Sequence, residues 1–272
     1  MPELPEVETT CKGIEPFIVG KTINNVIVRE TRLRWPVPTK ALRHNLATTP
    51  VLNVTRRAKY ILINLPNGCL IIHLGMSGTL RIASKAEPLK KHDHVDFVFH
   101  DNTILRFNDP RRFGCVLFAK NNEMPSMLSH LGPEPLDKSF DGEYLFKKAH
   151  KHRTPIKTFI TNQRIVVGVG NIYANEALYL AKIHPHHRTH KVSKAQFDNL
   201  AKVIKKVLKA AIKQGGTTLK DFRQSDGKPG YFSQDLKVYD KAGLACNECQ
   251  TQIESTRLGQ RSTYFCPSCQ KI

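Results

Sequence analysis

The chain has 272 residues, enough for two domains with hydrophobic cores of their own. Its 42 Lys and Arg residues against 23 Asp and Glu give a formal net charge of +19. This excess favours nucleic acid as the partner, because each neutralised phosphate releases counterions, with an anionic membrane surface or simple solubility as alternatives. There is no basic stretch followed by an apolar core, and the apolar runs are too short for a bilayer, so we expect neither a secretory signal nor a membrane span.

The first ten residues, MPELPEVETT, predict the start of a helix but leave two residues unexplained. Pro5 suits a first helical turn, the acidic residues that follow it favour the positive end of the helix dipole, and Val7 and Ile14 fall at helical spacing. The helix accounts for positions 5 to 14. It gives no reason for Pro2 and Glu3.

Residues 20 to 120 read as strands, because their short segments are rich in β-branched and aromatic residues and partly alternate. Turn signals such as PNG and HDN separate them, which predicts an antiparallel sandwich or barrel. The expected strands lie within 26–35, 51–66, 69–82, 94–109 and 113–120.

The pattern changes from about residue 121, and LGPEPL at 131–136 marks a linker before a series of helices. The last of these has an amphipathic stripe and is expected to end at Gly215 and Gly216. A long loop containing SDGKPG follows, and loops of this length in compact proteins are often functional. The expected helices lie within 140–151, 154–162, 171–183 and 193–214.

Four of the seven cysteines crowd the C-terminal end of the chain, in the order C-x2-C-x16-C-x2-C. Four thiolates fill a tetrahedral zinc shell and leave no position for water, so this spacing predicts one structural Zn²⁺ and not a disulfide framework. The segment between the two pairs has hairpin character, which favours a zinc ribbon whose basic tip, Arg257 to Arg261, contacts phosphates. The expected ligands are Cys246, Cys249, Cys266 and Cys269.

Three glycine- or arginine-containing segments admit both a functional and a structural interpretation. In VVGVGN, Gly168 and Gly170 precede a helix, so their amides form either a phosphate cradle or an ordinary packed turn, and the basic character of the chain favours the cradle for a DNA phosphate. In NDPRRFG, Phe113 beside two arginines suits a wedge between bases, but a core residue at a strand edge is equally compatible. Met76 in HLGMSG is likewise exposed or in the core; the sequence leaves both open.

Two further motifs have plain default interpretations. Lys59 in RRAKY lies at the edge of a strand, and a surface lysine is the default. His92 and His94 in KKHDHVD have no second cluster that would complete a metal shell, so a phosphate contact or a strand hydrogen bond is favoured.

Taken together, these segments resemble the bacterial formamidopyrimidine-DNA glycosylase family over essentially the whole chain. The similarity is carried by PELPEVE, RRAKY, HLGMSG, KHDHVD, DPRRFG, GVGNIYANEAL, AKIHP, QGGTTLKDF, SDGKPGYF and the terminal four-cysteine finger. The related endonuclease-VIII-like branch typically begins PEGPE and lacks the Met, Arg and Phe set. The presence of PELPE and of all three residues therefore favours the oxidised-purine branch.

The resemblance implies an α+β multidomain protein with DNA in the cleft between its domains. We expect an N-terminal β-sandwich with an N-terminal helix over 1–130 and a helix-two-turns-helix domain over 131–216. A lesion-recognition loop over 217–235 and a four-cysteine zinc ribbon over 236–272 would follow, with residues from Thr217 to Tyr231 folding over the flipped base.

The resemblance also assigns catalytic roles. Removal of Met1 would free the secondary amine of Pro2 to attack C1′ of the damaged nucleotide, with Glu3 as the acid/base group. Lys59 is matched to the proton donor of β-elimination and Arg261 to that of δ-elimination.

The same matching implies two sets of DNA contacts. One set fills the gap left by the everted base, which must leave the stack because its reactive carbon is inaccessible inside the duplex: Met76, Arg111 and Phe113, with Arg111 facing the orphan cytosine. The other set grips phosphates: His92, Arg112, His152, Lys157 and Asn171.

The sequence thus predicts a bifunctional DNA glycosylase and AP lyase of base-excision repair, specific for 8-oxoguanine and formamidopyrimidines in double-stranded DNA. We expect it to cleave oxidised or abasic strands by β,δ-elimination through a Schiff base on Pro2, as a monomer in the bacterial cytoplasm. The alternatives are an endonuclease-VIII-like enzyme for pyrimidines and a non-catalytic DNA-binding protein. A metallo-nuclease is disfavoured because the sequence offers no carboxylate cluster for an open metal site.

Overall fold

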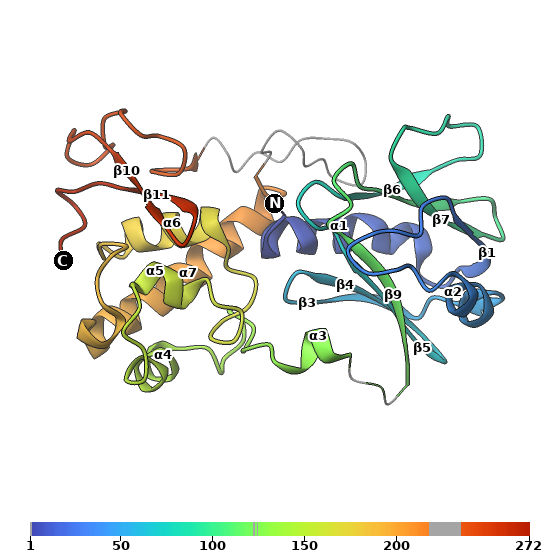
Figure 1. The fold of residues 1–272 in the computed structure, drawn as a ribbon, viewed down its shortest axis with the longest axis horizontal. Helices are drawn as coiled ribbons and strands as arrows, with labels where there is room; N and C mark the ends of the chain where they lie inside the picture. Colours follow the sequence, from blue (N-terminus) through green and yellow to red (C-terminus); the bar gives the residue numbers. More distant parts are fainter. Residues whose placement is uncertain (1, 122, 124, 218–234) are drawn as a thin grey trace. The chain divides into compact units, whose positions relative to one another are not determined.

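The structure, a computed structural model, describes residues 2–121, 123, 125–217 and 235–272, which form two compact units (Figure 1). The first unit contains residues 1–129 and 214–233, and the second contains 130–213 and 234–272. Two expectations fall outside the described residues: the removal of Met1, and the lesion-recognition loop from residue 218 to 234.

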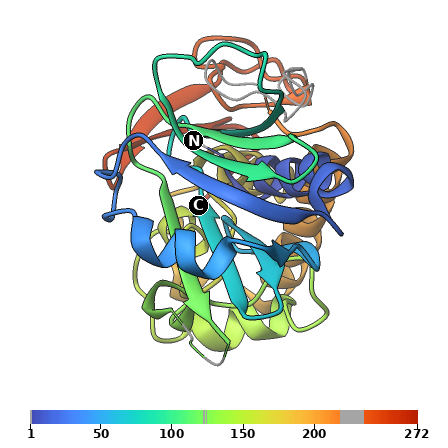
Figure 2. The same ribbon diagram turned by 90° about the vertical axis from the view of Figure 1, so that its right-hand side faces the viewer.

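The first unit contains the predicted β-sandwich of two antiparallel sheets (Figure 2). One sheet has the strand order β2-β1-β7-β8-β6 and the other the order β3-β4-β5-β9. The alternation of buried and partly exposed residues in β4 gives the pleated pattern of a strand with one face on the core. The strands are β1 (Thr22–Val28), β2 (Thr49–Pro50), β3 (Asn53–Arg57), β4 (Tyr60–Leu65), β5 (Gly68–His73), β6 (Thr79–Ala83), β7 (Asp93–Phe99), β8 (Ile104–Asn108) and β9 (Cys115–Lys120).

Two helices close the open sides of the sandwich. Helix α1 (Leu4–Ile18) contacts β3 and β4 of one sheet and β6 of the other, and α2 (Thr39–Leu46) contacts β1 and β9. The side chains of Val7 and Ile14 are fully buried, as the helical spacing predicted, and each contributes roughly 1.5–3 kcal/mol to folding. A single further turn, α3 (Ser126–Ser129), ends the unit's first segment.

Helix α2 corrects the expectation that residues 20 to 120 contain only strands. It is eight residues long, and only Leu42 and Leu46, one turn apart, are buried. Its N-cap is Pro38, whose side chain makes no capping hydrogen bond. Two apolar residues without a Ser, Thr, Asp or Asn cap give too weak a helical signal to be separated from the surrounding strands.

The second unit contains the predicted helices α4 (Gly142–Ala149), α5 (Ile156–Ile160), α6 (Asn171–Leu180) and α7 (Lys194–Lys213), with a short 3₁₀ turn at Thr189–Lys191. Helix α7 packs against α4 and α6 through its apolar stripe. The predicted stop is confirmed: α7 ends at Lys213, and Gly215 follows with φ 74°, a left-handed conformation that favours glycine. The predicted amphipathic stripe is buried, with these residues: Phe197, Leu200, Ala201, Ile204, Val207 and Leu208.

The C-terminal hairpin is also as predicted. Strands β10 (Glu254–Leu258) and β11 (Arg261–Phe265) are antiparallel, and Leu258 pairs with Arg261 across a two-residue turn. Gly259 and Gln260 in that turn both have positive φ, 53° and 62°, as a type I′ turn requires. The tight turn fixes Arg261 as the first residue after the tip.

Candidate active site

The N-terminal end of α1 holds Pro2 and Glu3 in a buried position. Glu3 is the N-cap of the helix and only 2% exposed, and it forms a capping box with Glu6. In that box the Glu3 backbone N–H donates to Glu6 Oε2 at 2.8 Å. The other oxygen, Oε1, accepts from the amide and the hydroxyl of Thr217 at 2.8 and 3.0 Å. Glu6 therefore ties the residue after Pro2 to Thr217, the first residue of the predicted lesion-recognition loop.

Lys59 is not the surface lysine that its local sequence suggests. It lies in the two-residue turn between β3 and β4, where Arg57 pairs with Tyr60, and it is only 8% exposed. Its neighbour Ala58 has φ 54°, a conformation more usual for glycine, and the Ala58 carbonyl accepts from Arg56 Nη1 at 2.8 Å. A lysine held in a tight, buried turn points to a defined role and not to a solvated charge.

His73 is a partly buried histidine that was not among the residues expected from the sequence. It lies opposite Tyr60 in the β4–β5 register, one position from Lys59, and its Nδ1 accepts the Gly75 amide at 2.9 Å. Burial, with the positive charges of Lys59 and Arg34, lowers the pKa of His73 to about 4. The imidazole is therefore neutral at physiological pH. Its place as the first residue of HLGMSG, three positions before Met76, was the available signal.

Two loops bring together the residues matched to gap filling. We name residues 74–78 the Met76 loop and residues 109–114 the Arg111 loop. They interlock so closely that a Cβ on Gly75 would lie 2.4 Å from the Gly114 amide nitrogen. Met76 is partly exposed and Phe113 is 46% exposed, with the Arg111 guanidinium over its ring at 5.2 Å from the centroid. The structure thus rules out a core position for Phe113 and places it on a loop that adjoins Met76.

The histidines of KHDHVD are fixed by the same region. His94 is buried, and its Nε2 lies 2.8 Å from the Asp109 carbonyl oxygen, a hydrogen bond of the structural kind expected. His92 is partly exposed, and its carbonyl accepts the Asp109 amide at 3.1 Å. Arg112 is exposed and pairs with Glu30 at 2.8 Å, so it is a surface cation of the Arg111 loop.

In the second unit, Lys157 and Asn171 converge on the hairpin. Lys157 is only 3% exposed, and its Nζ donates to the Ser262 carbonyl and the Thr263 hydroxyl at 2.9 and 2.7 Å. Asn171 Nδ2 donates to the same Ser262 carbonyl at 3.0 Å. Both residues therefore hold the strand that carries Arg261, which is itself exposed. The near-complete burial of Lys157 leaves its ammonium little surface for a phosphate, and its DNA contact stays a prediction.

The turn before α6 is tightly packed. Gly168 and Gly170 are buried, Gly168 has φ 78°, and its amide donates to Gln163 Oε1 at 3.3 Å. These features favour the packing interpretation of the glycines. Asn171 at the first turn of α6 is partly exposed, and its Oδ1 has no hydrogen-bond partner among the described residues. His152 is also partly exposed, with its ring 5.2 Å from that of Phe159.

The four predicted zinc ligands come together at the base of the hairpin, and their sulfur atoms all lie within 4.8 Å of one another. The Cys246–Cys269, Cys249–Cys266 and Cys249–Cys269 sulfur distances are 3.9, 3.4 and 3.4 Å. A tetrahedral site with Zn–S bonds of about 2.3 Å has sulfurs about 3.8 Å apart, so the cluster fits this ion. Tyr179 Oη, 3.1 Å from Cys246 Sγ, is a neighbour placed to donate to a thiolate.

Known protein families match along the chain in the same order as these features. The N-terminal domain of formamidopyrimidine-DNA glycosylase matches residues 1–116 and its H2TH domain residues 131–223, and the zinc finger found in FPG and IleRS matches 243–272. The chain belongs to the formamidopyrimidine-DNA glycosylase family. It is thus a base-excision-repair DNA glycosylase and AP lyase with one structural zinc.

Relatives of the glycosylase cover its full length. The formamidopyrimidine-DNA glycosylases of Salmonella arizonae and Salmonella newport are each 56% identical over 271 residues, 100% of both chains. Among solved structures, a Lactococcus lactis FPG mutant with Fapy-dG DNA is 33% identical at a TM-score of 0.92, over 100% of both chains. The Lactococcus lactis Fpg with abasic-site DNA is 34% identical at a TM-score of 0.92, over 99% of this chain and 100% of that one.

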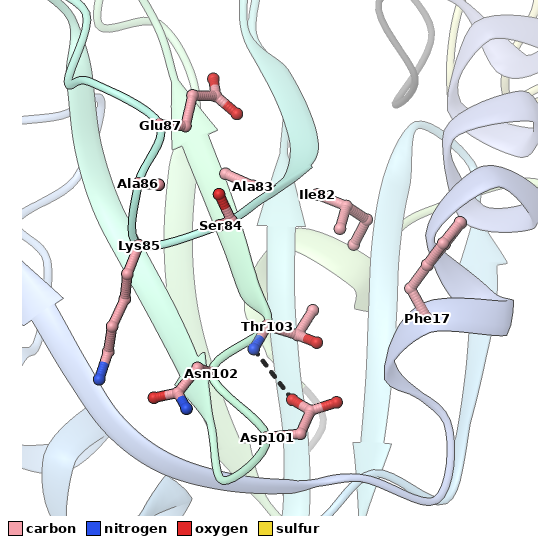
Figure 3. A pocket seen from close by; sticks show the side chains of 10 residues that line it. All are labelled: Phe17, Ile82, Ala83, Ser84, Lys85, Ala86, Glu87, Asp101, Asn102 and Thr103. Atoms are coloured by element: carbon pink, nitrogen blue, oxygen red, sulfur yellow. Dashed lines mark hydrogen bonds between the residues drawn. The ribbon is translucent and has the colours of Figure 1, made fainter.

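One surface hollow of the glycosylase lies apart from the matched site residues. This hollow, beside β6 and the β7–β8 turn, is lined by residues such as Phe17, Lys85 and Asp101, and none of the candidate site residues lines it (Figure 3). In the part of the chain that the structure describes, no helix is both long and apolar enough to cross a membrane.

Proposed function

We propose that this glycosylase excises 8-oxoguanine opposite cytosine and ring-opened formamidopyrimidines from double-stranded DNA, and then cleaves the strand by β,δ-elimination. The observation that carries the proposal is the Pro2–Glu3 end of α1, where the capping box and the burial of Glu3 fix the residue next to the nucleophile. The solved relatives support the substrate class: one is titled as a complex with Fapy-dG DNA, and another is MutM with carbocyclic 8-oxo-G DNA.

Once Met1 has been removed, the first step is attack by the Pro2 secondary amine on C1′ of the damaged nucleotide. A C–N bond forms, and the base departs with the electron pair of the glycosyl bond and takes up a proton. An α-amine titrates near ~8, so a useful neutral fraction exists at physiological pH, whereas a lysine near ~10.4 would need a large pKa depression. A secondary amine also yields a cationic iminium directly.

Glu3 supplies the acid/base chemistry of this step. Its proton goes to the sugar ring oxygen, the ring opens, and the iminium between Pro2 and C1′ acidifies the neighbouring C2′ proton. Loss of that proton expels the 3′ phosphate, and a second elimination expels the 5′ phosphate. By the family matching, Lys59 serves the β-elimination and Arg261 the δ-elimination. The buried turn that holds Lys59 and the hairpin that fixes Arg261 support specific roles for both.

Base excision requires the damaged nucleotide to leave the stack, so its place must be filled. We assign this to Met76, Arg111 and Phe113, with Arg111 reading the orphan cytosine. The interlocked loops that present these side chains support the assignment. The proposed phosphate contacts are His92, Arg112, His152, Lys157 and Asn171.

The proposal extends to organisation and location. The catalytic sandwich would occupy 1–130, the helical DNA-binding domain 131–216, the lesion-recognition loop 217–235 and the zinc ribbon 236–272. We expect the enzyme to act as a monomer, without membrane attachment, on the DNA of the bacterial cytoplasm. The similarity to bacterial enzymes over the full chain supports this location.

The nucleophile is tested by borohydride trapping on duplex DNA with an abasic site or 8-oxoguanine. Pro2→Gly or a Met1-retaining form should lose the covalent adduct, and an undiminished adduct would reject Pro2 as the nucleophile. Glu3→Gln should stop base excision while DNA affinity changes less than about threefold. Glu15→Gln, at an exposed position of the same helix, is the matched control and should behave as wild type.

Oxidised pyrimidines are a second candidate substrate class, because a Lactococcus lactis FPG that is 34% identical has been solved with DNA containing an oxidised pyrimidine. Single-turnover rates on matched duplexes with 8-oxoguanine or thymine glycol separate the two. A faster rate on thymine glycol would replace the oxidised-purine assignment with the endonuclease-VIII-like one.

A further inference from the structure

We propose that Asp109 is a positioning residue for gap filling: its buried carboxylate clamps the Met76 loop to the Arg111 loop and so presents their side chains to the emptied stack. This role rests on the proposed function, in which Met76, Arg111 and Phe113 fill the gap. Asp109 itself is the first residue of the Arg111 loop, is fully buried, and touches none of the reacting atoms in this assignment.

Both oxygens of the Asp109 carboxylate accept hydrogen bonds from the loops. Oδ1 accepts the Ser77 hydroxyl of the Met76 loop at 3.2 Å and the Arg111 amide at 3.3 Å. Oδ2 accepts the Gly114 amide at 2.7 Å, which closes the Arg111 loop on itself. One carboxylate therefore joins the Ser77 side chain of the Met76 loop to two backbone amides of the Arg111 loop. These amides, of Arg111 and Gly114, lie at the two ends of the segment that carries the Arg111 and Phe113 side chains.

The backbone of Asp109 is fixed as firmly as its side chain. Its amide donates to the His92 carbonyl at 3.1 Å, and its carbonyl lies 2.8 Å from His94 Nε2 and accepts the Arg112 amide at 3.3 Å. Arg112 then turns the chain with φ 56°. Because the anchor is held by β7 and its preceding turn, it is a rigid reference for the loop.

The carboxylate is buried without an ion pair among the described residues, which is costly unless its charge is met by donors. The two arginines that follow it do not meet that charge: Arg111 lies over Phe113, and Arg112 pairs with Glu30. The charge is instead met by two loop amides and one hydroxyl. The Gly114 bond, at 2.7 Å, has the short length of a charge-assisted hydrogen bond and fixes the end of the Arg111 loop, whereas the Ser77 and Arg111 bonds, at 3.2 and 3.3 Å, are longer.

Close packing around Gly114 restricts the position of the Arg111 loop. The Gly114 position has no room for a side chain, because a Cβ there would lie 2.5 Å from the His73 carbonyl and 3.0 Å from Asp109 Oδ2. A loss of the clamp would therefore shift the Arg111 loop as a unit. A displacement of about 1 Å in a positioning element lowers a rate by about 10- to 100-fold.

The test compares Asp109→Asn with Asp101→Asn. The asparagine keeps the size of the side chain but places its NH₂ group against an N–H donor, so one clamp bond is lost. Asp101 lies at the other end of β8, in the exposed β7–β8 turn, where it accepts the Thr103 amide at 2.9 Å (Figure 3). It controls for the loss of an acidic hydrogen-bonded side chain from the same sandwich.

Three quantities are measured for each protein: the single-turnover excision rate on 8-oxoguanine:cytosine duplex, the ratio of rates opposite cytosine and adenine, and borohydride trapping on a single-stranded abasic oligonucleotide. The single strand has no opposite base and no gap to fill. For Asp109→Asn we expect a 10- to 100-fold lower duplex rate and a smaller cytosine-to-adenine ratio, with single-strand trapping within about twofold of wild type. Asp101→Asn should match wild type in all three.

Equal losses on duplex and single strand, an unchanged duplex rate, or the same losses in Asp101→Asn would each overturn the positioning role. If Asp109→Asn does not fold, Ser77→Ala decides, because it removes only the bond between the loops: a duplex-specific loss of about fivefold supports the clamp, and none rejects it. A folded wild type that traps abasic DNA but excises no 8-oxoguanine overturns the proposed substrate, and a wild type that does neither overturns the proposed function itself.

Discussion

Lys157 and Ser262 are joined by a hydrogen bond of 2.9 Å that reaches from α5 to the zinc hairpin. The same ammonium donates to Thr263 Oγ1 at 2.7 Å, and Asn171 donates to the same Ser262 carbonyl. Ser262 directly follows Arg261, so two helices hold the strand immediately after the residue matched to δ-elimination. A buried lysine is used here as a structural donor, which its basic character alone would not indicate.

Lys157→Met should therefore loosen the strand that carries Arg261. We expect a loss of about 1–3 kcal/mol in the free energy of unfolding, because a buried charge-assisted donor is removed from two acceptors. On abasic DNA, the fraction of β,δ-product should fall relative to β-product. Lys202→Met, an exposed position on α7, is the control. If Lys157→Met is destabilised but its ratio of β,δ-product to β-product is unchanged, Lys157 contributes to stability alone. That result would reject an effect of Lys157 on Arg261.

His73 should make the first unit sensitive to acid. Its pKa is about 4 in the folded chain and near 6.5 when unfolded, so between these values the unfolded state binds more protons. Stability therefore falls as pH drops from 6.5 to 4, by about 2–3 kcal/mol from this residue. Urea unfolding of wild type and His73→Gln over this range measures the difference. The free energy of unfolding of the variant should depend less on pH than that of wild type. Parallel curves of unfolding free energy against pH would contradict the prediction. His100→Gln, at an exposed position of the same unit, should follow wild type.

Zinc should be required for the hairpin and not for the sandwich. Cys249→Ser removes one of four ligands, and a structural zinc contributes roughly 10 kcal/mol to the folding of such small modules. We expect one zinc per chain in wild type by atomic absorption, and loss of metal and of DNA affinity in the variant. Cys69→Ser alters a partly buried thiol in β5 and should retain both. Full zinc occupancy in Cys249→Ser would exclude the four-thiolate site.

Glu176 should anchor the chain a few residues before the first expected zinc ligand, Cys246. Its carboxylate is 2% exposed and accepts the amides of Lys237, Val238 and Tyr239 at 2.8, 3.0 and 2.8 Å, while burial raises its pKa. Glu176→Gln turns one acceptor into a donor that faces an amide, at a cost of about 1–3 kcal/mol. Hydrogen exchange of these amides should accelerate. Glu254→Gln, exposed on β10, should leave their exchange unchanged, and slow exchange in both variants would contradict the anchor.

Local patterns in the sequence were sufficient for much of the fold. The apolar stripe of α7 and the alternation along β4 predict which face is buried, because a helix or strand repeats its contacts along its own length. Helix α2 was not predicted in this way, because it has only two buried leucines and no sustained repeat. Its position depends on contact with β1 and β9.

By itself the sequence determined the residue types and the spacings: the paired cysteines, the basic surface, and Pro2 and Glu3 ahead of a helix. Only the tertiary structure decided which of these side chains are buried and which lie together. It placed Lys59 in a buried turn beside His73, turned Lys157 toward the hairpin, and brought Met76 next to Phe113 through Asp109. These relationships join residues far apart in the chain, and burial and hydrogen bonding depend on neighbours that no local pattern specifies.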